Sequence, residues 1–518
     1  MALTKSIAEI ISEDTSGLLD IHPTWTRVRL AEVASILNGF PFESALFSTD
    51  NGVPLIRIRD VSQGQTRTFY RGAFEEKFLV QRGELLIGMD GDFNVARWRS
   101  EPALLNQRVC KITPDERWYH PSLLEFALPG YLSAINSATS SITVKHLSSR
   151  SIEDIELPLP PRDEQTRIVE KLEELLSDLD AGVAELKAAQ RKLAQYRQSL
   201  LKAAVEGALT ADWRATRAKT GEPQETGAAL LQRILTERRT RWEASQLARF
   251  AEQGKIPLKG WQAKYPEPVE PSQGDHHKLP PDWTWATVDQ ISIAQKYGSS
   301  AKTSEDATGV PVLRMGNIKD GRLDLGKLKY LPQTHHEFPD LFLEEGDLLF
   351  NRTNSPELVG KTAIYRSEIR PCSYASYLIG VKLAPSCSPE FLSAFINSVY
   401  GRAWIKEVVT QQVGQANVNG SKLAALAVPL PPRDEQREIM ARLETQLHAS
   451  FDEEELLERA MKQAAAQRKN ILKAAFAGQL VPQDPNDEPA SVLLERIRAA
   501  KVEHAGNAKP VAKRGRKA

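Results

Sequence analysis

Eight consecutive residues, PLPPRDEQ, occur twice in this chain of 518 residues, first at 158–165 and again at 429–436. The two copies are 271 positions apart, and the same offset relates Gly207 to Gly478 at the end of the segments that follow them. A match that keeps one offset over this distance contains no insertion or deletion. The chain therefore contains a duplication whose two rear segments have equal length.

The segments in front of the two copies are related more loosely. Trp25 in PTWTRV matches Trp283 in PDWTWA at an offset of 258, and GVPLIRI from Gly52 matches GVPVLRM from Gly309 at 257. GVPLIRIRDV, ELLIGM and QRVCKITP have the composition of short strands, and VPVLRMGNI, DLLFNR and YLIGVKLAP repeat it. HPSLLEFALPGYLSAI and SPEFLSAFINSVYGRAWI are typical of helices. Each half therefore begins with a variable, mixed α/β domain.

The rear segments predict long helices that begin after PLPP, because proline cannot continue a helix. Apolar residues of the first helix alternate at spacings of four and three, which is typical of a heptad seam; the second seam is poorer, since Gln446, Ser450 and Glu453 fall at heptad positions. A seam needs a partner, so we expect one antiparallel coiled coil within the chain. The alternative is a coiled coil between two copies of the chain. The expected seam residues are Ile168, Leu172, Leu175, Leu179, Leu186, Leu193, Leu200, Ile439, Leu443, Leu457 and Ile471.

Polar, Gly-rich loops lie at corresponding places in the two front domains. They contain GMDGDFNVARWRS and SATSSITVKHLS in the first half, and NRTNSPELVGK and TQQVGQANVNGSKL in the second. Arg, Asn and Gln can form paired hydrogen bonds with base edges, and Lys, Ser and Thr suit phosphates, although ordinary solvated loops have a similar composition. The predicted DNA-binding residues are Asn94, Arg97, Arg99, Thr143, Lys145, Arg352, Asn354, Gln412, Gln415, Asn417 and Lys422.

Charge and hydropathy narrow the possible partners. Lys and Arg together number 67, as do Asp and Glu, so a large basic surface is not expected and nucleic-acid binding must use local patches or the charge of a partner. No apolar run approaches the length of a membrane helix, and the chain is therefore expected to be cytoplasmic.

Recognisable metal and catalytic motifs are missing from the sequence. Cys110, Cys372 and Cys387 are too few and scattered for a disulfide framework or a thiolate site, and the His276–His277 and His335–His336 pairs are expected to be loop residues without metal. There is no GxGxxG, no phosphate-binding lysine loop, no [DN]PP[YF] and no HExxH. The EEK at 75–77 resembles a fragment of a nuclease site, which leaves an unrecognised nuclease as an alternative. We otherwise expect no catalytic residues.

The order of these parts resembles the specificity subunit of a type I restriction-modification system. Two different α/β domains are each followed by PLPPRDEQ, a heptad helix and a short closing motif, LLKAAVEG or ILKAAFAG. The tail EPASVLLERIRAAK, abbreviated as ETGAALLQRILTERR after the first helix, extends the resemblance over nearly the whole chain. A long connector, from Ala211 to Pro281, departs from the simplest pattern.

The resemblance implies a non-catalytic subunit that binds double-stranded DNA, with each front domain recognising one half of a split target. The long helices would bind two methyltransferase subunits, and motor-nuclease subunits would complete the complex. S-adenosylmethionine would be bound by the methyltransferase and ATP and Mg by the motor-nuclease, with no cofactor on this chain. The residues expected to contact a partner at the helix starts are Arg162, Asp163, Glu164, Gln165, Arg433, Asp434, Glu435 and Gln436.

The predicted fold is a mixed, α+β arrangement: two α/β target-recognition domains joined by two long antiparallel coiled-coil helices in a pseudo-twofold tandem duplication. The alternative function is a coiled-coil scaffold whose α/β domains bind proteins. The expected segments are 1–157 for the first recognition domain, 158–210 for the first helix, 211–280 for a helical, Pro-rich connector, 281–428 for the second recognition domain, 429–480 for the second helix, and 481–518 for a C-terminal helix and basic tail.

Overall fold

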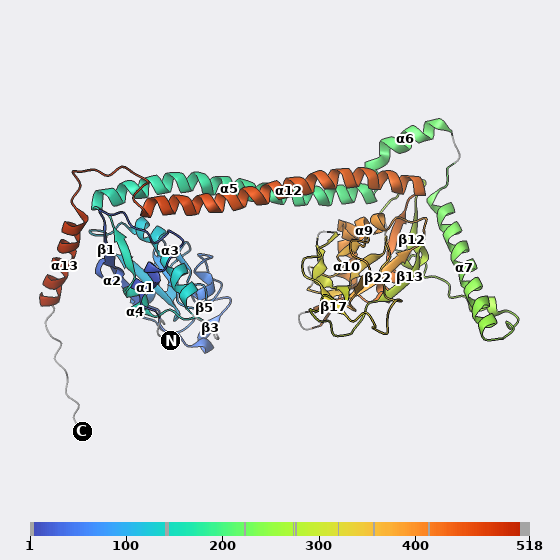
Figure 1. Ribbon diagram of the computed structural model, residues 1–518, viewed down its shortest axis with the longest axis horizontal. Coiled ribbons are helices and arrows are strands. Elements are labelled where there is room, and N and C mark those ends of the chain that lie inside the picture. Colours follow the sequence, from blue (N-terminus) through green and yellow to red (C-terminus); the bar gives the residue numbers. More distant parts are fainter. Residues whose placement is uncertain are drawn as a thin grey trace, which may run out of the picture. The chain divides into compact units, whose positions relative to one another are not determined.

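The chain forms two compact units, one made of Met1–Lys187 with Glu458–Ala518 and the other of Ala188–Leu457 (Figure 1). Each unit contains one α/β domain and about half of each long helix. The computed structural model describes residues 5–139, 145–221, 224–272, 274, 277–319, 321–355, 358–412 and 415–507.

The two long helices, α5 (Arg162–Val205) and α12 (Arg433–Phe476), each have 44 residues. Both begin directly after the PLPP segment and have two acidic residues in the first turn, where they favour the helix dipole. The equal length of the repeated rear segments is therefore the equal length of two helices.

Contacts between the two helices, or just beyond their ends, show in which relative direction the helices run. In the second unit Arg197 Nε donates to Ser450 Oγ at 2.5 Å, and the carbonyl of Leu209, just beyond the end of α5, accepts from Arg442, nearer the start of α12, at 3.0 Å. In the first unit Arg468 Nη1 lies 2.6 Å from Asp180 Oδ1. The helices are thus antiparallel where they meet.

Most of the expected seam is covered by packing. Ile168 and Leu172 belong to the core of the first unit, and Leu200, Ile439 and Leu443 to a cluster of the second. Leu176 and Phe476 are also buried, although the heptad pattern did not select them. The remaining seam residues comprise buried Leu193 and half-buried Leu175, Leu179, Leu186, Leu457 and Ile471.

The α/β domain of the first unit is built around a four-stranded sheet in the order β2-β10-β7-β8. One face, with Ile87 and Ile112, packs under α3, and the other, with Leu86 and Val109, packs against a second, five-stranded sheet. The elements of this domain are α1 (Ile7–Ser12), β1 (Thr26–Arg29), α2 (Leu30–Val33), β2 (Ala34–Asn38), β3 (Phe47–Ser48), β4 (Val53–Ile56), β5 (Phe69–Tyr70), β6 (Leu79–Val80), β7 (Leu85–Gly88), β8 (Val95–Arg97), β9 (Ala103–Leu105), β10 (Val109–Pro114), α3 (Pro121–Ala138), α4 (Ser149–Glu153) and β11 (Glu156–Leu159).

The α/β domain of the second unit repeats this plan, with a four-stranded sheet in the order β13-β22-β18-β20. Phe350 and Val381 face the cluster that contains α9, whereas Leu349 and Leu378 face the other side. Its elements are β12 (Thr284–Thr287), α8 (Val288–Ile291), β13 (Ser292–Tyr297), β14 (Val310–Leu313), β15 (Ile318–Lys319), β16 (Arg322–Leu323), β17 (Lys329–Leu331), β18 (Leu348–Asn351), β19 (Thr353–Asn354), β20 (Thr362–Ile364), β21 (Ser373–Tyr374), β22 (Leu378–Leu383), α9 (Pro389–Asn397), α10 (Val399–Val408), β23 (Thr410–Gln412), β24 (Gln415–Asn417), α11 (Gly420–Ala424) and β25 (Ala427–Leu430).

The first two residues of each repeat, proline and leucine, end a strand before the chain reaches the long helix. β11 pairs antiparallel with β1, and β25 pairs antiparallel with β12, so that Leu159 lies opposite Thr26 and Leu430 opposite Thr284. The repeated rear segment of each half is therefore fastened to the start of its own α/β domain.

Helices from the connector and the tail complete the two cores. In the connector, α6 (Ala211–Thr220) is followed by α7 (Gly227–Glu252), whose Leu230 and Ile234 enter the core of the second unit. In the tail, α13 (Ala490–Asn507) places Leu493 and Ile497 in the core of the first unit. Each helix thus covers an apolar face of the unit to which it belongs.

Candidate nucleic-acid interface

In both units, the backbone brings together two loop regions that are far apart in sequence. In the second unit β19 pairs with β24, with Thr353 opposite Asn417. In the first unit an isolated antiparallel bridge joins Asp90 to His146. Asp90 and Thr353 correspond at an offset of 263, and His146 and Asn417 at 271. The repeat therefore builds the same junction twice, and we name these sites the first and second recognition junctions.

The backbone hydrogen bonds next to the bridge are equivalent as well. Leu147 N donates to Met89 O at 2.7 Å in the first junction, and Val418 N donates to Arg352 O at 2.9 Å in the second. Because these bonds involve only the backbone, the two junctions can share one geometry while their side chains differ.

Three polar side chains meet at the first junction. His146 Nδ1 lies 2.6 Å from Asp90 Oδ1 and 3.1 Å from Arg108 Nη1. The Arg108 side chain is 54% exposed, and its backbone has a left-handed φ of 73°, which is uncommon for a residue with a side chain. A charged group held at the surface in this way can contact a base or a phosphate.

The second junction has different chemistry. The Arg352 guanidinium lies 4.9 Å from the centre of the Tyr297 ring, and its Nη1 donates to the Ser376 carbonyl at 3.3 Å. Arg352 Nε, Asn351 Oδ1 and Asn417 Oδ1 are buried and have no hydrogen-bond partner among the described residues. Buried polar atoms are normally paired, so their concentration here is consistent with a site that is completed by a ligand or by water.

Several of the predicted DNA-binding residues have other roles. The segment predicted as the loop GMDGDFNVARWRS contains the strand β8, which forms a hairpin with the preceding strand β7. Within it, Arg97 Nε donates to Glu125 Oε2 at 2.5 Å and Nη1 to the Gly83 carbonyl at 3.0 Å, which ties β8 to its own domain. Arg97 is therefore engaged within its own domain, and its predicted DNA contact stays a prediction. Asn94 and Arg99 are exposed, so their predicted DNA contacts stay predictions.

The two predicted lysines are engaged within the chain. Lys145 Nζ donates to the Asn136 carbonyl at 2.6 Å and to its side chain at 3.0 Å, and Lys422 Nζ donates to the Val408 carbonyl at 2.5 Å. Both lysines fasten their segments to the end of the preceding helix, and both are half-buried, so their predicted DNA contacts stay predictions.

The other predicted DNA-binding residues are described to different extents: some with their side chains, some by the backbone alone, and one not at all. Arg352 and Asn417 lie at the second junction. For Asn354, Gln412 and Gln415 the backbone is described, in β19, β23 and β24, but the side chains lie outside the described part. Thr143 falls outside the described residues altogether.

Sequence analysis missed Asp90, Arg108 and His146. All three lie in segments that the repeat had already singled out, since His146 follows Lys145 directly, Asp90 lies within GMDGDFNVARWRS and Arg108 within QRVCKITP. Their common location depends on strand pairing between distant segments, which residue type and spacing do not reveal.

The residues at the helix starts are also reassigned in part. Glu164 and Glu435 are 0% and 1% exposed. Trp25 Nε1 donates to Glu164 at 3.0 Å, and Trp283 Nε1 donates to Glu435 at 2.8 Å. Gln483 also bonds to Glu164, while Thr210 and Arg214 bond to Glu435. Burial raises the pKa of Glu164 above its usual 4.5.

The neighbouring glutamines are buried in the same way. Gln165 accepts from His120 N at 2.8 Å and donates to the Pro160 carbonyl at 3.0 Å; Gln436 accepts from Ser388 N at 2.8 Å and donates to the Pro431 carbonyl at 2.9 Å. The expectation that Glu164, Gln165, Glu435 and Gln436 contact a partner is therefore corrected, because their polar atoms are used within the chain. The other four expected partner contacts stay predictions: Asp163, Arg433 and Asp434 are exposed, and Arg162 is half-buried.

The His335–His336 pair lies beside a carboxylate, which the sequence analysis did not expect. His335, His336 and Glu337 bring their donor atoms within 4.8 Å of one another, although the sequence indicated no carboxylate at metal spacing beside this pair. His335 Nε2 lies 2.8 Å from Glu337 Oε2, so these two side chains already pair with each other.

Comparisons with known proteins agree with the repeated architecture. A family model described as "Type I restriction modification DNA specificity domain" matches this chain twice, at residues 23–188 and 280–457. The chain belongs to this family. The EcoBI specificity subunit of Escherichia coli is 33% identical over 523 residues, covering 98% of each chain, and the EcoKI specificity subunit of strain K12 is 25% identical, covering 93% of this chain and 96% of the relative.

A specificity subunit is the DNA-recognising, non-catalytic part of a type I restriction-modification system, and this chain is one. No comparison supports the alternative of a protein-binding scaffold. A solved structure from work on assembly and conformational transition of a type I R-M system shares the fold, with a TM-score of 0.52 at 16% identity over 89% of this chain and 99% of that one. None of the described helices is both long and apolar enough to span a membrane.

Proposed function

We propose that the two recognition junctions each read one half of a split double-stranded DNA target, with Asp90, Arg108 and His146 acting in the first unit and Arg352 and Asn417 in the second. The observation that carries this proposal is the equivalent pairing of Asp90 with His146 and of Thr353 with Asn417. A shared backbone junction that carries different side chains suits two different base sequences.

The long helices are proposed to hold two methyltransferase subunits around a pseudo-twofold, antiparallel coiled coil, with motor-nuclease subunits joining them. The equal lengths of α5 and α12 support this arrangement, because two identical partners would need two matched surfaces. S-adenosylmethionine is proposed to reside in the methyltransferase, and ATP and Mg in the motor-nuclease. The complex would act on DNA in the cytoplasm.

Methylation mapping tests the half-site assignment. The complete chain is combined with its methyltransferase and given a library of duplexes, and the methylated sequences are determined. Exchanging the side chains of one junction should change the preference for one half-site and leave the other half-site unchanged. Loss of preference at both half-sites from an exchange confined to one junction, with normal subunit assembly, would contradict the proposal.

A further inference from the structure

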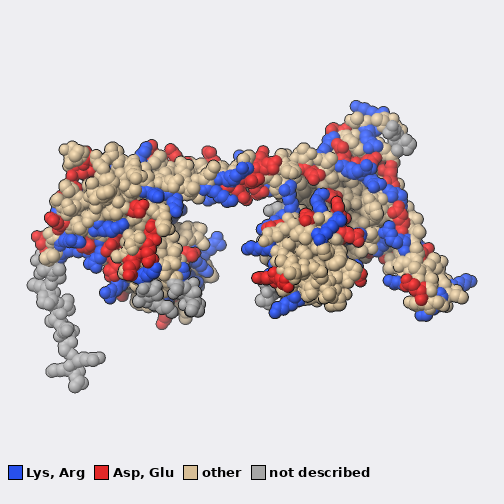
Figure 2. Space-filling model, in the orientation of Figure 1, with Lys and Arg blue, Asp and Glu red and all other residues tan. Residues whose placement is uncertain are grey.

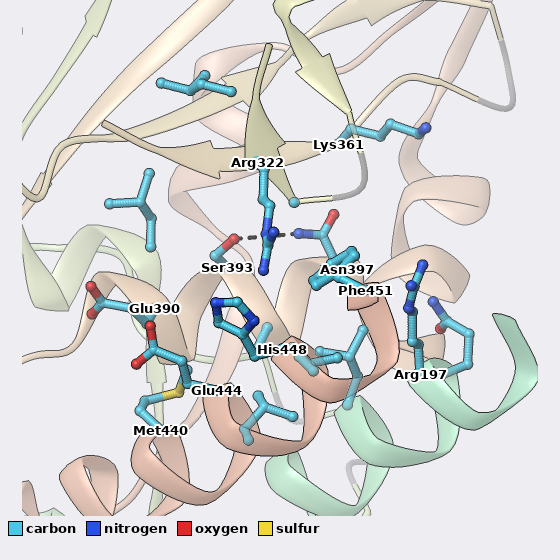
Figure 3. Close-up of a pocket in the computed structure, with 18 of the residues that line it drawn as sticks. Arg197, Arg322, Lys361, Glu390, Ser393, Asn397, Met440, Glu444, His448 and Phe451 are labelled. Atoms are coloured by element: carbon cyan, nitrogen blue, oxygen red, sulfur yellow. Dashed lines mark hydrogen bonds between the residues drawn. The ribbon is translucent and has the colours of Figure 1, made fainter. Parts of the chain in front are cut away.

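A cavity of about 710 Å³ lies within the second unit, away from the second recognition junction (Figure 3). Its walls come from α5, α9 and α12 and from the strands β16 and β20, and its volume is within the range of small-molecule sites. Leu201, Met440 and Leu443 form part of an apolar floor. Nothing in the DNA-recognition function proposed above uses this cavity.

Positive charge predominates around the cavity. Its lining includes five basic side chains, Arg197, Arg322, Lys361, Arg366 and Arg402, against three carboxylates, Glu368, Glu390 and Glu444. Of the carboxylates, Glu390 lies 3.6 Å from Arg366 and also accepts from Ser388, so its charge is already shared. An anion entering the cavity would thus meet more positive than negative charge.

Two of the arginines cover one aromatic ring. The Arg322 guanidinium lies 3.6 Å from the centre of the Phe451 ring, and the Arg197 guanidinium lies 4.2 Å from it. Figure 3 shows Arg322 coming from the strand side of the cavity and Phe451 from α12. Two like charges on one ring repel each other, and burial together with Arg197 lowers the pKa of Arg322.

The two arginines differ in their counter-ions. Arg197 Nη1 lies 2.7 Å from Glu454 Oε2, which neutralises it. Among the residues that the structure describes, none forms an ion pair with Arg322. Arg322 is exposed, so its guanidinium is open to an anion from outside and its N–H groups can form charge-assisted hydrogen bonds with that anion.

The duplicated half provides an internal comparison. At an offset of 271, Arg197 corresponds to Arg468 and Phe451 to Asp180, and these two form an ion pair of 2.6 Å in the first unit. Gly64 and Gly321 correspond at an offset of 257, which places Gln65 at the position of Arg322. The first unit therefore has a carboxylate where the second has a ring, and a neutral side chain where the second has Arg322. The unpaired charge is specific to the second unit and is not required by the fold.

We propose that this cavity binds a phosphate ester, with the phosphate at Arg322 beside Arg197 and the organic part over the apolar floor. Arginine suits this role because its fork of N–H donors matches phosphate oxygens. The same chemistry is offered by a free phosphate ester and by a backbone phosphate of DNA, and the experiment separates these two sources.

The test uses the full chain and isothermal titration with adenosine monophosphate and with inorganic pyrophosphate. The wild-type chain should bind both probes. Arg322→Gln, which installs the residue found at the corresponding position of the first unit, should weaken binding by about tenfold or more, the effect of losing one charge-assisted contact. Phe451→Asp, which copies the ion pair of the first unit, should abolish binding by supplying an internal counter-ion. Arg468→Gln in the first unit is the matched control and should bind as the wild type does.

Thermal unfolding curves establish that each variant is folded, and Phe451→Asp keeps the test decisive if Arg322→Gln is unstable. Displacement of adenosine monophosphate by a DNA duplex would assign the site to backbone phosphate, while simultaneous binding of both would assign it to a free phosphate ester. The proposal would be overturned if the wild-type chain bound neither probe at millimolar concentration. It would also be overturned if the folded Arg322→Gln and Phe451→Asp variants bound the probes as tightly as the wild-type chain does.

Discussion

The carboxylate of Glu164 is buried between two donors that are far from it in sequence, Trp25 and Gln483. Glu435 occupies the equivalent position with Trp283 and Thr210. A buried carboxylate is tolerated only when hydrogen bonds satisfy it, and here they link the start of each long helix to an α/β domain and to the chain that follows the other helix. The identity of the two PRDEQ segments therefore reflects a shared internal joint.

This joint predicts a specific pH dependence. Burial raises the pKa of Glu164 in the folded chain, so ionisation of this carboxyl group opposes folding. The protonated carboxyl group therefore contributes its full stability below the usual pKa of 4.5, and this contribution is lost as pH rises through the raised pKa of the folded chain. Glu164→Gln does not titrate. As pH falls from neutral towards 4.5, the melting temperature of the wild type should therefore rise relative to that of the variant.

At neutral pH, Glu164→Gln should lower stability by about 1–3 kcal/mol, because its NH₂ group would face a donor where the carboxylate accepts. Asp163→Asn, at the exposed neighbouring position, is the control and should change little. Thermal unfolding across the pH range measures both effects. A difference between wild type and Glu164→Gln that is independent of pH would show that Glu164 has an ordinary pKa.

The recognition junctions predict separate effects on the two half-sites. Arg108→Ala and His146→Ala should relax selectivity for one half-site, and Asn417→Ala for the other, by about 1–3 kcal/mol where a base contact is lost. Binding to duplexes altered in one half-site, in the presence of the methyltransferase, provides the measurement. Arg97→Ala is the matched control: it breaks the ion pair with Glu125, so it should lower the melting temperature and spare selectivity. Reduced stability without altered selectivity in all three junction variants would show that they are structural.

Residue type alone could predict only part of this chemistry. Arg352 and Asn417 were predicted because the repeat places polar segments at matching positions, and the structure places both at the second junction. The ion pair of Arg97 was not predicted, because its carboxylate partner, Glu125, lies on α3, 28 positions away. Ion pairs and bridges between distant segments depend on the folded register, which a local pattern does not encode.

At the scale of elements, α7 and α13 show how the duplication completes its cores. Both begin with related sequences, and both have an ion pair at the start, between Arg233 and Glu225 at 2.9 Å and between Arg496 and Glu488 at 2.9 Å. The sequence showed that these segments are copies, but not that each would close an α/β core. That outcome depends on packing, since an amphipathic helix can cover any suitable apolar face.

Shortening one buried side chain in either helix should destabilise one unit at a time. Ile497→Ala in α13 and Ile234→Ala in α7 each remove a buried side chain, which costs about 2–5 kcal/mol in a well-packed core. Hydrogen exchange resolved along the chain should show lost protection in the first unit for Ile497→Ala and in the second for Ile234→Ala. The exposed Val502→Ala is the control. Uniform loss of protection in both units from either variant would mean that the units unfold together.

The long helices were the element that the sequence predicted best, because proline marks their start and a heptad pattern marks the buried face of the first. The front domains were harder. β8 was assigned to a loop because GDFN has the composition of a polar turn, whereas only Met89 to Asn94 separate it from β7, with which it pairs. Buried Phe93 and Trp98 anchor the hairpin.

At the scale of the whole molecule, the formal net charge of zero agrees with the mixture of positive and negative side chains on the surface (Figure 2). Figure 2 shows Lys and Arg interspersed with Asp and Glu on the face in view, and many arginines of the described residues form ion pairs. Where charges of both signs are interspersed in this way, sequence-independent attraction to DNA should be weak. Partner subunits would then be expected to supply part of the phosphate contact.

The final prediction concerns the length of the helices that connect the two units. If α5 and α12 set the separation of the recognition junctions, one added heptad in each, after Ala189 and after Ala460, keeps the seam in phase and lengthens the pair by about 10 Å. DNA rises about 3.4 Å per base pair, so the unread gap between half-sites should grow by up to roughly three base pairs. The half-site sequences themselves should not change.

Lengthening only one helix provides the control, because its added apolar positions would have no matching partner. That variant should lose stability, with a lower melting temperature, whereas the doubly lengthened variant should remain close to the wild type. Methylation is mapped on targets with the same half-sites and different gaps, using the chain together with its methyltransferase. A folded, doubly lengthened variant that keeps the original gap would show that contacts outside α5 and α12 determine the spacing.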